Sequence, residues 1–105
     1  MDLENITINN KEFRKILETN KKSQLVVMSI DDDIPKEIHQ NSDQFIRVEK
    51  GTIDVFLWKG KKYEKYTLMD GYSITIPMGT YHYVRKTYLS DPPAKIYTIY
   101  SPPVH

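Results

Sequence analysis

The stretch of sequence that decides the fold covers residues 37–51 and reads Glu37-Ile38-His39-Gln40-Asn41-Ser42-Asp43-Gln44-Phe45-Ile46-Arg47-Val48-Glu49-Lys50-Gly51. Glu37 and His39 are two residues apart, so their side chains project to the same face of an extended strand. Gln44 follows on a second segment, which ends in a turn at Gly51. The stretch therefore offers a carboxylate, an imidazole and an amide, three side-chain groups that can bind a divalent metal ion.

A second stretch, from Gly71 to His82, supplies another histidine in a similar setting. With it, the chain offers two imidazoles, one carboxylate and one amide as ligands for a single metal ion. The alternatives are that the four side chains form a hydrogen-bonded polar cluster without metal, or that most of them are exposed. Gly51, Gly71, Pro77 and Gly79 are interpreted as turn residues only.

Length and composition narrow the class of protein. A chain of 105 residues predicts one domain, 1–105, with 1–9 as a polar lead-in. Fifteen basic and fourteen acidic residues give a net charge of +1, which argues against a dedicated nucleic-acid or anionic-membrane surface. The absence of cysteine excludes disulfides, thiolate zinc sites and cysteine nucleophiles. Without a signal-peptide pattern or an apolar run of about 20 residues, we expect a cytoplasmic protein with no membrane partner.

Most of the chain has the pattern of short strands separated by turns. We predict a buried strand over 24–30, further strands over 52–58, 63–68, 72–76, 82–88 and 94–100, and a hairpin turn at 59–62. About seven or eight short strands are typical of a closed or sandwiched antiparallel sheet. The spacing of Phe13, Ile16 and Leu17 predicts one short helix over 11–18, capped by Asn9 or Asn10.

The two stretches resemble the paired signatures of the cupin superfamily, which are small β-barrels of jelly-roll topology. The family's first signature is His-x-His, three or four residues, Glu, six residues and Gly; the chain has Glu37-x-His39, four residues, Gln44, six residues and Gly51. The second signature is Gly, five residues, Pro-x-Gly, two residues and His, and the chain matches it from Gly71 to His82. The resemblance covers about residues 10–105, with signature one at 31–51 and signature two at 71–86.

Flanking phrases such as Asp43-Gln44-Phe45 and Pro77-Met78-Gly79-Thr80 resemble the small cupins of the mannose-6-phosphate-isomerase-like (cupin type 2) subgroup. The resemblance implies an all-β, single-domain cupin jelly-roll β-barrel, preceded here by the short N-terminal helix. Asp31 and Lys86 replace a glycine and an asparagine of the signatures, but neither position is a ligand in the family.

The ligand positions also differ from the usual set. Glu37 stands where the family has its first histidine, and Gln44 stands where it has glutamate. The two changes compensate, because the ligand set keeps one negative charge. We therefore predict one divalent transition metal, Mn, Fe, Co, Ni or Zn, held by Glu37, His39, Gln44 and His82.

Function is less constrained than fold. The first hypothesis is a metal-dependent enzyme of isomerase type that acts on a small sugar-like or hydroxy-carbonyl molecule, with Glu37 as general base. The alternatives are a metal-dependent dioxygenase and a small-molecule-binding module without turnover. Tyr81, Tyr97 and Tyr100 are candidate pocket residues. We also expect a homodimer, because small cupins tend to associate and apolar residues such as Phe56 and Trp58 would otherwise be exposed.

Overall fold

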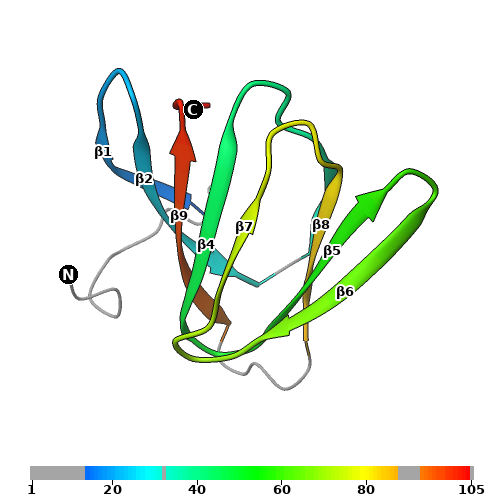
Figure 1. Cartoon of the computed structure of the whole chain (residues 1–105). Helices are drawn as coiled ribbons and strands as arrows, with labels where there is room; N and C mark the ends of the chain where they lie inside the picture. The colour runs from blue at the N-terminus through cyan, green and yellow to red at the C-terminus, as the bar shows by residue number, and fades with distance from the viewer. Residues whose placement is uncertain (1–13, 32, 88–92, 105) are drawn as a thin grey trace.

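The computed structural model describes residues 14–31, 33–87 and 93–104, which form nine β-strands in two antiparallel sheets (Figure 1). One sheet has the strand order β1-β2-β9-β4-β7, and the other has the order β3-β8-β5-β6. The strands are β1 (Arg14–Thr19), β2 (Gln24–Ile30), β3 (Ile34–Glu37), β4 (Asp43–Lys50), β5 (Ile53–Lys59), β6 (Lys62–Leu68), β7 (Ser73–Ile76), β8 (His82–Lys86) and β9 (Ala94–Ser101). This architecture confirms the all-β jelly-roll prediction.

The predicted N-terminal helix over 11–18 is wrong. Residues 14–19 form strand β1, which pairs with β2 from Arg14 opposite Met28 to Thr19 opposite Gln24. A helix of about two turns is marginal by itself, so pairing with a buried neighbouring strand outweighs the local helical pattern. The remaining helix residues, 11–13, and the predicted lead-in at 1–9 lie outside the described residues.

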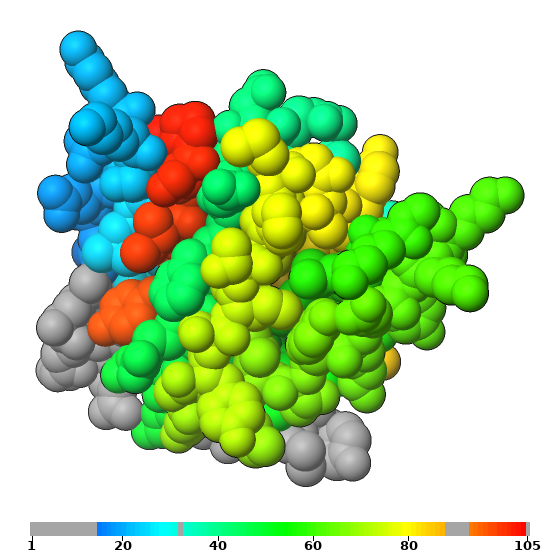
Figure 2. Space-filling view, in the orientation of Figure 1, coloured from blue at the N-terminus to red at the C-terminus, as the bar shows by residue number. Residues whose placement is uncertain are grey.

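Local turn chemistry explains why the strands end where they do. Asn20 closes the β1–β2 hairpin, because its Oδ1 accepts hydrogen bonds from the backbone N–H groups of Lys22 (2.8 Å) and Ser23 (2.9 Å). At the β5–β6 turn Gly60 adopts a φ of 66°, which residues with a side chain rarely adopt. Figure 2 shows this hairpin tip projecting from the body of the molecule.

The core lies between the two sheets and consists almost entirely of aliphatic side chains. Successive side chains of a strand point to opposite faces of its sheet, so every second residue of β5 and of β9 faces this core. Ile46, Ile53, Val55 and Ile96 are completely buried there. In the part of the chain that the structure describes, we find no helix long and apolar enough to cross a membrane.

The outer face of the smaller sheet carries an aromatic cluster. Phe56 is only 9 % exposed, although it points away from the core. The rings of Tyr63 and Tyr83 lie 5.4 and 5.5 Å from its ring, and the Arg85 guanidinium lies 5.1 Å away. Much of the Phe56 surface that motivated the homodimer is therefore already covered within one chain, and association stays a prediction.

Candidate metal centre

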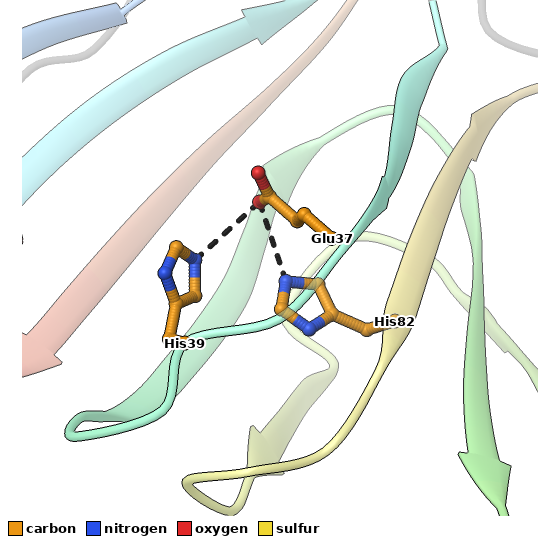
Figure 3. Close-up of side chains that lie close together, drawn as sticks. All are labelled: Glu37, His39 and His82. Atoms are coloured by element: carbon orange, nitrogen blue, oxygen red, sulfur yellow. Dashed lines mark hydrogen bonds and ion pairs between the residues drawn. The ribbon is translucent and has the colours of Figure 1, made fainter.

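The pairing of β3 with β8 brings a carboxylate and an imidazole together. Glu37, the last residue of β3, lies opposite His82, the first residue of β8, so both side chains point into the space between the sheets. His82 Nε2 is 3.3 Å from Glu37 Oε1, and His39 Nε2 is 3.4 Å from the same oxygen. Figure 3 shows the carboxylate of Glu37 between the two rings. The candidate ligand atoms of these three residues all lie within 4.8 Å of one another.

Backbone contacts fix the loops that carry the two histidines. The Gly79 N–H donates to the carbonyl oxygen of His39 at 2.8 Å, which ties the loop before β8 to the segment after β3. In the same loop, the Met78 N–H donates to Asp43 Oδ1 at 2.8 Å. Gly79 has a φ of 75°, and a side chain there would strain this turn. The second signature thus positions His82 against the first.

The orientation of the His82 ring favours a cation next to Glu37. Its Nδ1 lies 3.0 Å from the carbonyl oxygen of Thr80, which can only accept a hydrogen bond, so Nδ1 carries the hydrogen. In the neutral ring, Nε2 then directs its lone pair at the Glu37 carboxylate, an unfavourable contact at 3.3 Å. A proton or a metal ion at Nε2 removes the repulsion. This arrangement, with one ring nitrogen bonded to a carbonyl, is usual for metal-binding histidine.

The three side chains differ in their exposure to solvent. His82 is 1 % exposed, His39 is 16 % exposed and Glu37 is 39 % exposed. The imidazoles therefore form the buried side of the cluster and the carboxylate forms its open side. A small molecule that reached the cluster would meet Glu37 first.

Gln44 lies on β4 and reaches the cluster through Tyr100. Its Nε2 donates to Thr98 Oγ1 at 2.9 Å and to the Tyr100 hydroxyl at 3.3 Å, and the Tyr100 ring packs edge-on against the His39 ring at 5.2 Å. Gln44 itself is 4 % exposed. Its buried Oε1 accepts no hydrogen bond from any described residue. A buried carbonyl oxygen without a donor is costly, and a metal ion would satisfy it.

The structure separates the three candidate pocket tyrosines. Tyr100 is 2 % exposed and faces inward beside His39. Tyr97 is three residues earlier on β9 and half-buried, with the opposite orientation to the core-facing residues of that strand. Tyr81 is 48 % exposed, and the Nζ of Lys36 lies 5.1 Å from the centre of its ring. Only Tyr100 therefore belongs to the surroundings of the histidines.

The sequence interpretation missed Thr98 and the carbonyl of Thr80. Thr98 is completely buried and holds the Gln44 amide. Its position two residues before Tyr100 placed it on the inward face of the last strand, which is a signal that strand parity could have given. The Thr80 carbonyl left no signal, because backbone groups are the same in every residue.

The donor set can hold a first-row divalent metal. Two imidazole nitrogens and a carboxylate oxygen suit Mn, Fe, Co, Ni and Zn, and the amide oxygen of Gln44 is a weaker neutral donor. Such a set leaves coordination positions for oxygen atoms of a bound molecule.

Two curated proteins are similar in sequence to the chain. L612 of Acanthamoeba polyphaga mimivirus is 42 % identical over 94 % of the chain, and YrkC of Bacillus subtilis is 38 % identical over all of it. The chain spans 62 % and 58 % of the lengths of these two relatives. No family model matches the chain.

Solved structures share the fold. BH2720 from Bacillus halodurans is 38 % identical, with a TM-score of 0.81 over 96 % of this chain and 83 % of that one. A cupin-2 domain-containing protein from Shewanella frigidimarina is 19 % identical, with a TM-score of 0.68 over 82 % of this chain and 76 % of that one. A recombinant oxalate oxidase in complex with glycolate is 18 % identical, with a TM-score of 0.64 over 76 % of this chain and 41 % of that one.

Proposed function

The chain has the cupin fold and belongs to the family of the Bacillus halodurans protein BH2720, and we propose that it is a divalent-metal-binding cupin that acts on a small polar molecule. The observation that carries the proposal is the convergence of Glu37, His39 and His82, whose ligand atoms lie within 4.8 Å of one another. Gln44 is proposed as the fourth ligand, since its buried Oε1 accepts no hydrogen bond from the described residues.

We propose that the reaction is of isomerase type on a hydroxy-carbonyl compound. Glu37, His39 and His82 would hold the divalent ion, whose Lewis acidity would polarise the carbonyl and hydroxyl oxygens of the compound and acidify the C–H bond of the hydroxyl-bearing carbon. Glu37 is the most exposed of the three residues, so its carboxylate, once it leaves the metal, is best placed to accept that proton and to return it to the adjacent carbon. The hydroxyl proton of the substrate moves to the former carbonyl oxygen, so both protons stay in the molecule, no oxidant is needed and the product is an isomer of the substrate.

The buried residues would hold and orient the reacting groups. The Thr80 carbonyl fixes the tautomer of His82 by accepting the Nδ1 hydrogen. The Tyr100 ring supports the His39 ring from the side at 5.2 Å. Both histidines are more than four-fifths buried, which keeps bulk water away from that side of the site.

Metal content is the first measurement. Protein purified without a histidine tag or chelator is analysed by mass spectrometry beside the double variant His39→Ala/His82→Ala. We expect one metal ion per chain, absent from the double variant. If the protein takes up no metal after addition of Mn, Fe, Co, Ni or Zn, then the four residues form a metal-free polar pocket and the proposal fails.

The identity of the metal and the effect of Glu37→Gln decide between the proposed reaction and its alternatives. A glutamine at 37 can still offer an oxygen to the metal but cannot accept a proton at neutral pH. Isomerase activity on hydroxy-carbonyl compounds that is lost in Glu37→Gln supports the proposed base. Bound iron with oxygen consumption would instead indicate a dioxygenase. Ligand binding without turnover would indicate a binding module.

A further inference from the structure

A cleft lies on the opposite side of the sheet that carries His82. It has a volume of about 610 Å³ and is formed by β5, β6 and β8. Asp54, one of its lining residues, stands between Ile53 and Val55, which are both fully buried in the core, so Asp54 points to the outer face. Its cross-strand partners are Thr67 on β6 and Arg85 on β8.

Asp54 and Arg85 form the fixed part of this cleft. Arg85 Nε and Nη2 donate to Asp54 Oδ2 at 3.2 and 2.6 Å, and Thr67 Oγ1 donates to Asp54 Oδ1 at 2.6 Å. Burial by itself raises the pKa of Asp54, but the hydrogen bonds from Thr67 and Arg85 outweigh it, and the pKa lies below its usual range. Both carboxylate oxygens are thus engaged. The guanidinium is further held 5.1 Å from the Phe56 ring.

Two cationic groups in the lining keep donors that the contacts with Asp54 do not use. The guanidinium of Arg85 contacts Asp54 through Nε and Nη2, and its Nη1 forms no hydrogen bond with a described residue. Lys65, an exposed residue of β6, lines the same cleft and forms neither a hydrogen bond nor an ion pair with the described part of the chain. Lys86 also lines the cleft, but its Nζ is 3.0 Å from Asp31 Oδ1.

The cleft is positively charged and suits a small anion. Three cations and one carboxylate line it, and with Asp31, the ion-pair partner of Lys86, the formal charge is +1. An arginine held by a carboxylate and a ring is pre-oriented, so little side-chain entropy is lost when it binds an anion. Threonine side chains complete the lining and are suited to hydroxyl groups of a ligand.

We propose that this cleft is a second binding site, which takes the phosphate group of a small phosphorylated molecule between Lys65 Nζ and Arg85 Nη1. The site is separate from the histidine cluster, because Arg85 faces outward while His82, three residues earlier on the same strand, is buried in the interior. The proposal therefore does not depend on the proposed metal or on the proposed reaction.

The test is a titration of the whole chain with inorganic phosphate, in which the backbone amide signals are monitored by nuclear magnetic resonance. Lys65→Gln removes one donor, and Lys62→Gln is the matched control, because Lys62 is an exposed lysine of the same strand that does not line the cleft. We expect saturable shifts at Thr67 and Arg85. Loss of a charge-assisted contact in Lys65→Gln should raise the dissociation constant about tenfold. Lys62→Gln should change it less than twofold.

Three results would overturn the proposal. The first is an equal weakening of phosphate binding in both lysine variants, which would mean that phosphate is attracted to positive charge in general and not to this cleft. The second is a set of shifts centred on His39 and His82, which would place the anion in the other site. The third is no saturation by about 20 mM phosphate. A phosphorylated sugar compared with the same sugar without phosphate then shows whether the site prefers an attached group.

Discussion

Replacement of Thr98 by valine tests whether Gln44 is held in place for a metal ion. Valine has nearly the same shape as threonine, so the change mainly removes the hydroxyl that accepts the 2.9 Å hydrogen bond from Gln44 Nε2. The Tyr100 hydroxyl remains, but at 3.3 Å it is a longer and weaker partner. The Gln44 amide is then free to rotate, and Oε1 loses its fixed direction.

The size of the effect follows from the bond that is lost. A neutral buried hydrogen bond contributes about 1 kcal/mol, which corresponds to roughly a fivefold change in the population of the orientation that it favours. The apparent dissociation constant for the metal should therefore rise about fivefold. Loss of a residue that orients a metal ligand typically costs about 10- to 100-fold in affinity, so fivefold lies just below that range, as expected for a weak amide ligand.

The assay is competition for Mn²⁺ or Zn²⁺ with a chromophoric chelator, on wild-type protein and on Thr98→Val. Tyr100→Phe is the matched comparison, because it removes the weaker of the two bonds and should change the dissociation constant less than threefold. Thermal unfolding followed by circular dichroism checks that both variants are folded. An unchanged metal affinity in a folded Thr98→Val protein would refute the role of Gln44 as an oriented ligand.

Three further changes test other parts of the molecule. Gln44→Glu should tighten metal binding by about tenfold or more in the chelator assay, since it adds a second carboxylate to the ligand set; weaker binding would show that position 44 does not face the metal. Glu37→Gln should retain metal at reduced affinity and abolish proton transfer to and from the substrate, measured as exchange of the substrate C–H hydrogen with deuterium from the solvent; exchange at the wild-type rate would remove Glu37 as the base. Asp54→Asn should lower the unfolding free energy by about 1–2 kcal/mol, and the value is modest because Arg85 is 44 % exposed. The melting temperature should therefore fall by about 5–10 °C. The pKa of Asp54 is lower in the folded protein, so its contribution is present above pH 4 and is lost as the pH falls through the folded-state pKa. The difference in melting temperature between wild type and Asp54→Asn should therefore shrink in acid, and a difference that stays constant down to pH 2 would contradict this origin.

Most of the fold and part of the site could be predicted from local patterns. Strand β2 begins and ends at the predicted residues, Gln24 and Ile30, because its β-branched run is bounded by turn residues on both sides. The structure brings Glu37, His39 and His82 together, although His39 lies beyond the end of β3 and not on the same strand as Glu37. The metal itself, the role of Glu37 and the homodimer stay predictions.

The sequence by itself determined which residues alternate, where turns interrupt them and which side chains have the chemistry to bind a metal. These properties depend on neighbours within a few residues. Only the tertiary structure decided that residues 14–19 form a strand, because that outcome depends on pairing with β2 rather than on local spacing. It also placed Tyr100 beside His39, joined Gln44 to Thr98 and paired Asp54 with Arg85. Each of these contacts links residues on different strands, and strand register is fixed by burial of the whole core.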